Sequence, residues 1–261
     1  MNSTKNESQT KNKQQQGKSA DEKESQVLKM IESFKDKDEI TIEQMLKKGV
    51  HLGHKKGKWN PKMRDFILTV KQGIHIIDLN KTKKSLEEAT DFLKSKLAGG
   101  NKQVLFVSTK RETRDLVTQI AQYCQMPYVV ERWIGGVLTN FKTIRRRVEK
   151  LMAIEELQEK GELKKYTKKE QAAFKEKIEK FNKKMGGIKN MKGLPEVVIV
   201  VDLVADELAL KEAKRMNIPV VAIVDTNADP EKVDHAIVAN DDALSSLRLI
   251  LSFIASKIKN F

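Results

Sequence analysis

The sequence has little of several features that would each define a class of protein. Among its 261 residues there is one cysteine, Cys124, so an internal disulfide and a thiolate metal cage are both excluded. No run of 18 apolar residues occurs, which argues against a membrane-spanning helix. The first 24 residues also lack the apolar stretch of a secretory signal. These absences favour a protein of a reducing compartment, in which Cys124 is a core residue.

Loops that bind cofactors or carry nucleophiles are missing as well. The sequence contains no G-x-G-x-x-G, no G-x-x-x-x-G-K-[ST] and no G-x-S-x-G. Gly135-Gly136 follows Trp133, and not a junction between a strand and a helix, so it is interpreted as a turn. The sequence therefore predicts no cofactor and no small-molecule substrate.

Positive charge is abundant and unevenly distributed. The formal net charge is +14, with 50 Lys and Arg against 36 Asp and Glu. Residues 47–114 carry 17 basic and 6 acidic side chains, and residues 139–193 carry 17 and 8, whereas residues 195–261 carry 7 and 11. Basic surfaces attract polyanions. Concentration of the charge in two blocks predicts that one face of the protein meets phosphate groups.

The first part of the chain has the composition of a disordered segment. Residues 1–24 contain only Met1 and Ala20 as apolar side chains, too few to offset the entropy of ordering the chain. Apolar residues at 27, 28, 31 and 34 could form a short amphipathic turn or two. We expect a disordered polar tail over residues 1–39 and an ordered domain over residues 40–261.

From Ile40 onward, predicted strands and helices alternate. Short apolar runs predict strands at 74–79, 103–108, 127–130, 196–201, 220–224 and 237–238. Helical spacing predicts helices at 81–97, from Thr109 onward, at 206–216 and after Asn240. Thr109 begins T-K-R-E, a capping box, and Asn240 is a predicted helix cap. This alternation predicts a parallel sheet with helices on both faces.

One region interrupts that alternation. Apolar residues recur at spacings of three and four along 141–157 and again along 174–188, with Gly161 and a polar stretch between. Eighteen residues of helix span about 27 Å. The pattern predicts an antiparallel coiled-coil hairpin at about 141–188 that protrudes from the sheet.

Histidines offer the first candidates for a metal site. His51 and His54 could be neighbours on a helical turn, with His75 as a third imidazole. Lysines surround the first two, and a cationic neighbourhood disfavours a metal. Packing or phosphate contacts are the preferred interpretation.

Carboxylates offer the second set of candidates for a metal site. Asp202 and Asp225 each follow an apolar strand, and Asp229 lies close by with Asp234 and His235. Strand ends of parallel sheets line ligand-binding crevices, so a divalent cation or a nucleotide-dependent enzyme is one hypothesis. The other, which we prefer, is that Asp229 caps a turn at Pro230 while the remaining carboxylates bond loops.

Cations interleaved with aromatic rings point to nucleic acid. Lysines and an arginine surround Trp59 in K-K-G-K-W-N-P-K-M-R, and Arg132 precedes Trp133. Cations bind phosphate, and an exposed indole can stack on a base. Each tryptophan could equally be a core residue. Residues 145–147 are three successive arginines, which point in different directions around a helix and can bridge two phosphates or two partners.

Eight collinear segments resemble one known family. They are M-L-K-K-G-V-H-L-G-H at 45–54, W-N-P-K-M at 59–63, G-I-H-I-I-D-L-N-K-T at 73–82, F-V-S-T-K-R at 106–111, R-W-I-G-G-V-L-T-N-F-K-T-I at 132–144, G-G-I-K-N-M at 186–191, V-A-I-V-D-T-N-A-D-P at 221–230 and N-D-D-A at 240–243. In order and content they resemble the second ribosomal protein of the small subunit, in its bacterial and organellar form. The long polar tail and Ala239, where a glycine is usual, depart from that pattern.

The resemblance implies a flavodoxin-like α/β domain with an inserted hairpin, and a structural role in the cytoplasmic ribosome without catalysis. The implied partners are small-subunit rRNA and neighbouring ribosomal proteins, including the largest one of the small subunit. The resemblance places RNA contacts at Lys55, Lys58, Trp59, Asn60, Lys62, Lys110, Arg111, Arg132, Asn140, Lys142 and Arg145. To these the run of arginines adds Arg146 and Arg147.

Overall fold

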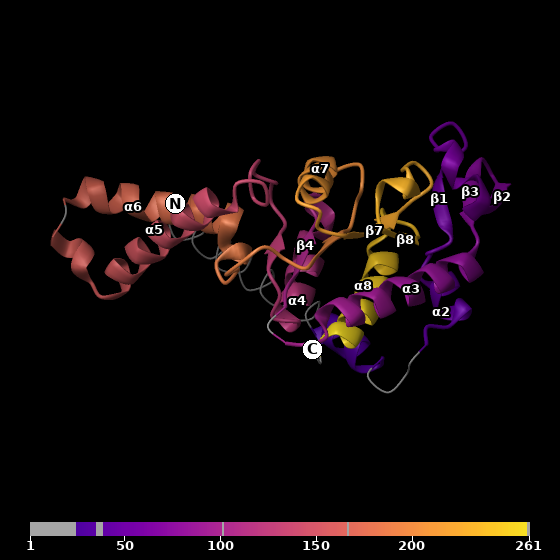
Figure 1. Cartoon of the computed structure of the whole chain (residues 1–261), viewed down its shortest axis with the longest axis horizontal. Helices are drawn as coiled ribbons and strands as arrows, with labels where there is room; N and C mark the ends of the chain where they lie inside the picture. The colour runs from indigo at the N-terminus through magenta and orange to yellow at the C-terminus, as the bar shows by residue number, and fades with distance from the viewer. Residues whose placement is uncertain (1–24, 35–38, 101, 166, 260–261) are drawn as a thin grey trace, which may run out of the picture.

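A five-stranded parallel sheet forms the centre of the computed structural model (Figure 1). The structure describes residues 25–34, 39–100, 102–165 and 167–259. The spatial order of the strands is β5-β4-β6-β7-β8, and all neighbours run parallel. Their bounds are β4 Val104–Val107, β5 Tyr128–Val129, β6 Val197–Val200, β7 Val220–Val224 and β8 His235–Val238. Counted within the sheet, this is the flavodoxin-like order 2-1-3-4-5, so the predicted fold class is confirmed.

Strand residues alternate between two cores. Phe106 and Ile199 belong to the core on one face of the sheet, whereas Leu105 and Val198 belong to the core on the other face. Side chains on a strand point to opposite faces in turn, and both faces here are buried. This explains why β6 is an unbroken run of valine and isoleucine.

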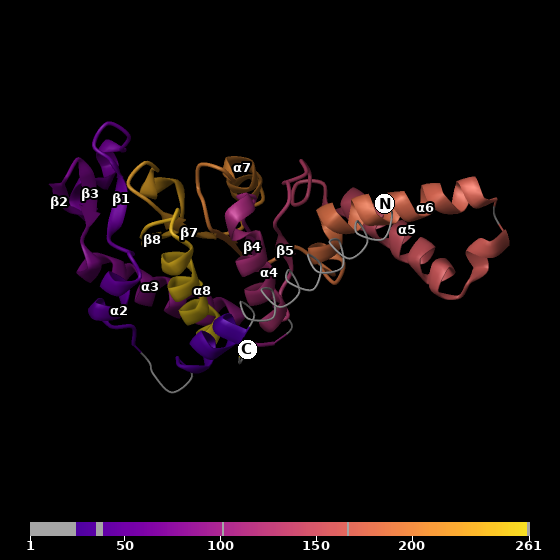
Figure 2. The ribbon, with the colours of Figure 1, turned by 180° about the vertical axis from the view of Figure 1, so that it is seen from behind.

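Helices cover both faces of the sheet (Figures 1 and 2). Their bounds are α3 Leu79–Leu97, α4 Arg114–Tyr123, α7 Glu207–Arg215 and α8 Leu244–Ile258. Cys124, which ends α4, is 6% exposed, so the prediction of a core cysteine is confirmed. Burial raises the pKa of its thiol to about 12. Within the described residues, no helix is long and apolar enough to cross a bilayer.

A second, three-stranded antiparallel sheet precedes the parallel one. It has the order β1-β3-β2, with β1 Leu52–Lys55, β2 Ile67–Lys71 and β3 Ile74–Ile77. A short helix, α2 Ile42–Lys47, leads into it, and the 3-10 helix η1 Pro61–Phe66 separates β1 from β2. The strand predicted at 74–79 therefore exists but ends at Ile77 and lies in this small sheet.

The predicted helical hairpin projects from the opposite end of the molecule (Figures 1 and 2). It consists of α5 Phe141–Glu159 and α6 Lys168–Met185, with the 3-10 segments η3 Glu162–Lys165 between them and η4 Gly186–Ile188 after them. Ile144, Val148 and Leu151 bury one side of α5. The hairpin is inserted between β5 and β6, and its coiled-coil packing stays a prediction.

Packing begins earlier in the chain than the sequence indicated. Residues 25–32 are helical, and Val27, Ile31 and Phe34 are buried in the core beside α8. The rings of Phe34 and Phe253 meet edge to face at 5.5 Å between centroids. The predicted boundary at Ile40 is therefore too late, because a short amphipathic turn is a weak sequence signal on its own. The predicted disorder of residues 1–24 lies outside the described residues.

Two predicted helix caps are corrected. The 3-10 helix η2 Arg111–Thr113 intervenes before α4, and Thr109 donates its hydroxyl to Asp206 Oδ1 at 2.7 Å. The N-cap of α8 is Ala243, while Asn240 Oδ1 accepts from the backbone amides of Asp242 and Ala243 in the preceding turn. The local pattern predicted that each side chain caps a helix. Thr109 instead bonds the distant Asp206, and Asn240 bonds amides of its own turn.

Candidate nucleic-acid interface

The first group of predicted contact residues lies at the end of β1 and in the loop that follows it, at the upper right of Figure 1. Lys55, Lys58 and Trp59 are all exposed, with Trp59 at 38%. The Trp59 ring packs against the His75 ring, with 5.3 Å between centroids and 37° between the ring planes. Trp59 is therefore half-packed, with one side available to a partner, and His75 is the residue on the sheet that holds it.

Close contacts with the end of β7 fix this loop. The backbone amide of His54 donates to Thr226 Oγ1 at 2.8 Å, and that of Asn60 donates to the Thr226 carbonyl at 2.8 Å. A Cβ at Gly53 would lie 2.6 Å from Thr226 Cγ2, so only glycine allows β1 to approach this closely. Asn60 also caps η1, because its Oδ1 accepts from the amide of Lys62 at 3.0 Å.

Lys62 differs from its neighbours because it is paired within the protein. Its ammonium donates to Asp229 Oδ2 at 3.0 Å and also forms an ion pair with Glu231. Asp229 in turn caps the 3-10 helix η5 Pro230–Lys232 by accepting from the Glu231 amide. The prediction that Asp229 caps a turn at Pro230 is confirmed.

The second group spans the loop from β5 to α5 and the first turn of α5, where Arg132, Asn140 and Lys142 are exposed. A buried carboxylate from α7, Glu212, organises this loop. Its Oε1 accepts from Trp133 Nε1 at 3.0 Å and from the Gly136 amide at 2.7 Å. Its Oε2 accepts from the amides of residues 138 and 139 and from the Thr139 hydroxyl, at 3.1 to 3.2 Å. Five donors thus converge on one side chain.

Those donors determine the charge state of Glu212. Burial raises the pKa of the carboxyl, but the hydrogen bonds from Trp133 and the loop amides outweigh it and leave the pKa below its usual value. Trp133, 6% exposed and bonded to this carboxylate, is a core residue. The sequence left open whether Trp133 stacks on a base or packs in the core, and the structure shows that it packs in the core.

The run of arginines at the start of α5 separates into two roles. Arg145 Nη1 donates to the carbonyl oxygens of Lys189 and Met191 at 2.7 and 3.1 Å, and its Nε donates to Glu149 Oε1 at 2.9 Å. Arg145 therefore joins α5 to the segment that leaves the hairpin. Arg146 and Arg147 are exposed, and they form no ion pair that involves another described residue.

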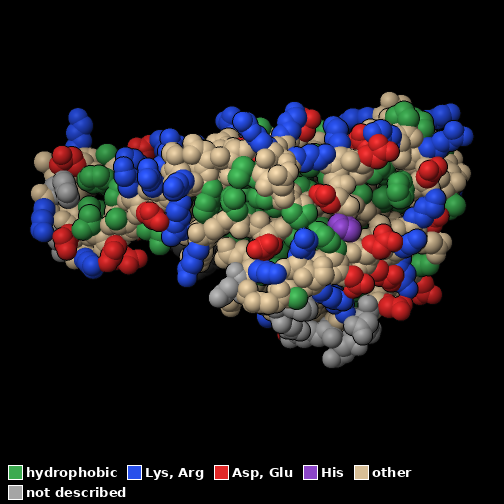
Figure 3. Space-filling view, in the orientation of Figure 1, with side chains coloured by type: hydrophobic (Ala, Val, Ile, Leu, Met, Phe, Trp, Pro, Cys, Tyr) green, Lys and Arg blue, Asp and Glu red, His purple; other side chains and the backbone are tan. Residues whose placement is uncertain are grey.

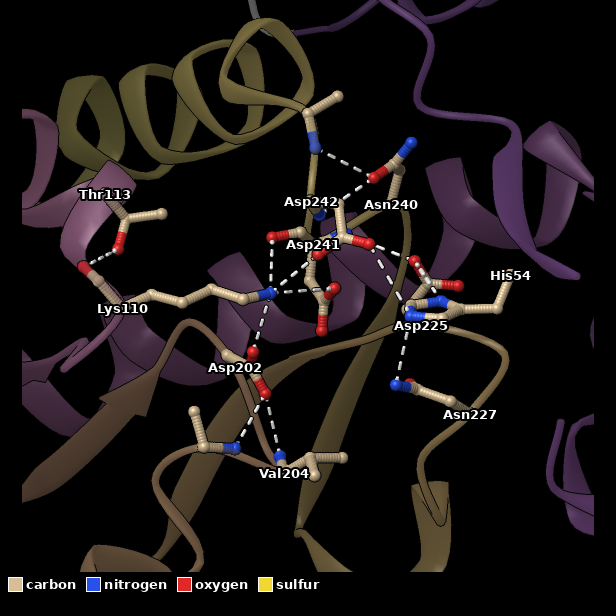
Figure 4. Close-up of polar contacts among 12 residues, drawn as sticks. His54, Lys110, Thr113, Asp202, Val204, Asp225, Asn227, Asn240, Asp241 and Asp242 are labelled. Carbon is tan, nitrogen blue, oxygen red and sulfur yellow. Dashed lines mark hydrogen bonds and ion pairs between the residues drawn. The ribbon is translucent and has the colours of Figure 1, made fainter. Parts of the chain in front are cut away.

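The third group, Lys110 and Arg111, follows β4 at the carboxyl edge of the parallel sheet. Arg111 is exposed, but Lys110 is drawn into a cluster of carboxylates (Figure 4). Its Nζ lies 2.7 Å from Asp202 Oδ2 and 2.8 Å from Asp242 Oδ1. Burial lowers the pKa of Lys110, yet its bonds to Asp202 and Asp242 outweigh burial and raise the pKa above its usual value.

Lys110 and Asp202 also lie at the point where the strand order reverses, between β4 and β6. Ligands of flavodoxin-like folds bind at such a point. Here Asp202 Oδ1 accepts from the amides of Val204 and Ala205 at 2.8 and 2.9 Å, and Asp206 bonds Thr109. The protein's own side chains bridge this crevice, and Asp202 bonds its loop as predicted.

The residues next to His54 in the sequence indicate a cationic environment that His54 does not have in the fold. His51 and His54 do not share the helical turn that a metal site would have used, because β1 begins at Leu52 and includes His54. Lysines flank His54 in the sequence, but in space its Nδ1 lies 3.2 Å from Asp225 Oδ2 and its Nε2 lies 3.5 Å from Asp242 Oδ2. The hydrogen bond to Asp225 is the main cause that raises the pKa of His54.

Two buried carboxyls at this edge have unusual acidities. Burial, with the charges of Asp202 and Asp225, raises the pKa of Asp241 to about 7. Burial also raises the pKa of Asp206 to about 6, although hydrogen bonds from Thr109 act in the opposite direction. Neither residue was a sequence-based candidate, and neither was Glu212. Two sequence signals could have indicated such residues: the N-D-D-A motif, which contains Asp241, and the acidic residue Glu212 on the inward face of α7.

The surface view separates the charges. Figure 3 shows Lys and Arg side chains on the hairpin and along the upper edge of the molecule, while Asp and Glu side chains gather at the lower right, over α2 and α3. The loop after β1 reaches the same upper side. A cation-rich side thus lies beside an acidic patch. Because α3 belongs to the basic block 47–114, this patch does not follow the distribution of charge along the sequence.

The protein's own side chains bridge the ligand crevice of this flavodoxin-like sheet, and a basic hairpin projects from it; this combination is typical of a structural protein that binds nucleic acid. The family model described as ribosomal protein S2 matches residues 45–260. Small ribosomal subunit protein uS2 of Petrotoga mobilis (strain DSM 10674 / SJ95) is 45% identical over 219 residues, which cover 84% of this chain and 76% of that protein. The chain belongs to the ribosomal protein S2 family, whose members are structural proteins and not enzymes. The alternative hypothesis of a nucleotide-dependent enzyme is therefore wrong.

Proposed function

We propose that the chain, a structural constituent of the small ribosomal subunit, contacts small-subunit rRNA through an exposed subset of the predicted residues. That subset comprises Lys55, Lys58, Trp59, Arg111, Arg132, Asn140, Lys142, Arg146 and Arg147. As a family member the chain is a protein of the ribosome, which in bacteria lies in the cytoplasm. Its partners are rRNA and other ribosomal proteins.

Two observations support this subset: its side chains are exposed, and the excluded cations, including the exposed Lys62, are paired within the protein. Each of the nine side chains is exposed, whereas Lys62, Lys110 and Arg145 donate to carboxylates or carbonyls of the protein itself. A cation that is already paired gains less from a phosphate than a hydrated one. Asn60 is half-buried and caps η1. We therefore assign these four residues to positioning the loops that carry the contacts.

The loops are held in place before RNA arrives. Glu212 fixes the segment that carries Arg132 and leads to Asn140, and Thr226 fixes the segment that carries Lys58 and Trp59. A pre-ordered loop loses less conformational entropy on binding. This favours recognition of a folded RNA surface by shape and phosphate position.

Contact with the largest small-subunit ribosomal protein is part of the same proposal. Leu68 and Val70 on β2 are 68% and 41% exposed and point to the same side of the small sheet. Adjacent apolar side chains on an edge strand are typical of a protein contact. We assign this side of β2 to a protein neighbour and not to RNA.

The test compares two charge reversals of equal size. The double variant R146E/R147E changes the proposed surface, and K84E/K96E changes two exposed lysines of α3, which cover a different face. Small subunits depleted of this protein are titrated with each full-length variant at several salt concentrations, and bound protein is measured by sedimentation.

We expect R146E/R147E to bind about 10- to 100-fold more weakly and K84E/K96E to bind like the unchanged protein. The plot of log affinity against log salt should also become shallower by about 1.4 to 1.8 for R146E/R147E, because each phosphate contact contributes about 0.7 to 0.9. Equal affinities and slopes for the two variants would assign Arg146 and Arg147 to a solvated face and refute this part of the proposal.

A further inference from the structure

We propose that Lys189 is a positioning residue, which fixes the direction of the helical hairpin and therefore the place where Arg146 and Arg147 meet RNA. Lys189 directly follows η4, in the segment that leaves the hairpin. Its backbone and its side chain both bond α5. This inference rests on the RNA contacts proposed above for the two arginines.

Two contacts join Lys189 to α5 at different points of that helix. The carbonyl oxygen of Lys189 accepts from Arg145 Nη1 at 2.7 Å, near the start of α5. Its Nζ lies 2.8 and 2.7 Å from Oε1 and Oε2 of Glu155, ten residues further along the helix. Ten residues of helix span about 15 Å. A helix that is held at one point can pivot there, whereas two points so far apart define its direction.

The segment that carries Lys189 is itself fixed to the parallel sheet. Ile188 and Met191, on either side of Lys189, are 2% and 0% exposed and belong to the core on one face of the sheet. Gly187 lies so close to the backbone of Tyr128 in β5 that a Cβ would overlap the Tyr128 carbonyl oxygen. Lys189 therefore connects α5 to a part of the chain that cannot move independently of the sheet.

Glu155 receives a further bond, which comes from α6. Asn182 Nδ2 donates to Glu155 Oε1, so this carboxylate joins both helices of the hairpin to Lys189. Burial raises the pKa of Glu155, but the hydrogen bonds from Lys189 and Asn182 outweigh it and leave the pKa below its usual value. The side chains of Lys189 and Glu155 are only 23% and 22% exposed. Salt screens a partly buried ion pair less than an exposed one.

Two other ion pairs of the hairpin lack this connection. Lys160 pairs with Glu156 in α5, and Lys180 pairs with Glu176 in α6. Both pairs lie within one helix, and all four side chains are more than half exposed, at 58% to 71%. Such pairs contribute little to stability. Lys160 therefore provides a matched control for Lys189, because its replacement removes an ion pair without separating two elements.

The first measurement follows the direction of the hairpin in the full-length chain without RNA. Spin labels are attached to E159C, at the end of α5, and to K211C, on α7. Both positions are exposed, whereas Cys124 is buried and its thiol has a raised pKa, so it should stay unlabelled. The distribution of distances between the labels reports how freely the hairpin moves relative to the sheet.

The second measurement follows RNA binding in chains without the labels. Small subunits depleted of this protein are titrated at several salt concentrations, and bound protein is measured by sedimentation. Both measurements compare the unchanged protein with K189M, with the charge swap E155K/K189E and with the control K160M.

We expect K189M to broaden the distance distribution and to weaken binding about 3- to 10-fold, because only the fraction of molecules whose hairpin points in the binding direction, about a third to a tenth, can bind. The plot of log affinity against log salt should keep its slope, since Lys189 acts through the hairpin and not on a phosphate. A lost phosphate contact would instead make the slope shallower by about 0.7 to 0.9.

The charge swap should restore a narrow distribution and bring binding back to within about two-fold of the unchanged protein. Asn182 can follow the swap, because its amide can turn and present Oδ1, which accepts no hydrogen bond from a described residue. K160M should match the unchanged protein in both measurements. Rescue by the swap separates a specific pairing from a general loss of stability.

Three results would overturn the proposal. The first is a distance distribution in K189M as narrow as that of the unchanged protein, and the second is equal binding by the two. The third is a shallower salt slope in K189M, which would make Lys189 an RNA contact itself. Unchanged binding by R146E/R147E, together with a broadened distribution in K189M, would refute the RNA assignment of the two arginines and support the fixed direction of the hairpin.

Discussion

Replacing Glu212 with glutamine should destabilise the loop that leads into the hairpin. The two carboxylate oxygens accept five hydrogen bonds, two at Oε1 and three at Oε2. Glutamine has nearly the same shape but replaces one oxygen with an amino group. In either orientation, two N–H donors of the loop then face another donor.

The expected cost follows from those two lost bonds. A hydrogen bond to a charged group contributes about 1.5 to 3 kcal/mol. Two of them give at least about 3 kcal/mol if the loop relaxes only partly. For a chain of this size, that loss lowers the melting temperature by roughly 6 to 12 °C.

Urea unfolding of E212Q at pH 7 measures the change in the free energy of unfolding. Hydrogen exchange should show faster exchange at the amides of residues 136, 138 and 139. The matched control is E207Q on the same helix, where Glu207 is exposed and forms an i,i+4 pair with Lys211. E207Q should change the free energy of unfolding by less than about 0.5 kcal/mol.

The pH dependence provides a second check with a definite sign. The pKa of Glu212 is lowered in the folded state, so its stabilisation is present above the unfolded value of 4.5 and disappears as the pH falls through the folded value. The difference between the unchanged protein and E212Q should therefore shrink below pH 4.5. A loss under about 1 kcal/mol at pH 7 would show that the five contacts do not hold the loop.

Three further substitutions test other parts of the structure. Asp206 has a folded pKa of about 6 against an unfolded value of 3.8, so its contribution to stability is present below pH 3.8 and is lost as the pH rises through 6. D206N should therefore remove about 3 kcal/mol of the pH dependence of the free energy of unfolding between pH 3.8 and 7, as measured by urea unfolding. Identical pH profiles of the unchanged protein and D206N would contradict the raised pKa. A Cβ at Gly187 would overlap the Tyr128 carbonyl oxygen, so G187A should cost more than about 2 kcal/mol in the same assay, whereas G57A, with open space around it, should cost less than about 1 kcal/mol. Arg145 bonds two carbonyls at the base of the hairpin, so R145A should increase hydrogen exchange along α6 more than R146A does; equal exchange would remove its positioning role.

Strands of the parallel sheet could be predicted because their signal is local. The strands β4, β6 and β7 are continuous apolar segments of the sequence. The helices of the hairpin repeat apolar residues at spacings of three and four residues. The small sheet was harder to predict, because β1 is Leu-Gly-His-Lys and β2 has only one half-buried residue, Ile67, in an otherwise exposed strand. Neither has the alternation of a half-buried strand.

The site was less predictable because its contacts are distant in sequence. Glu212 bonds residues 73 to 79 positions away, and nothing near it in the sequence indicates those donors. Lys110 appeared to be a free cation, and only the fold brings three aspartates to it. Membership of the family, by contrast, is recognisable from collinear sequence motifs, which need no tertiary contact.

The packing of α8 against the N-terminal turn has a consequence for synthesis of the chain. Residues 246–258 of α8 are almost entirely buried, and Phe253 meets Phe34. Their ring contact joins an early segment to the last helix in chain order. While a ribosome is still translating this chain, the early segment lacks its partner, and apolar side chains such as Ile31 stay uncovered until α8 emerges. A protein of the translation machinery thus reaches its own stable state only after α8 has been translated.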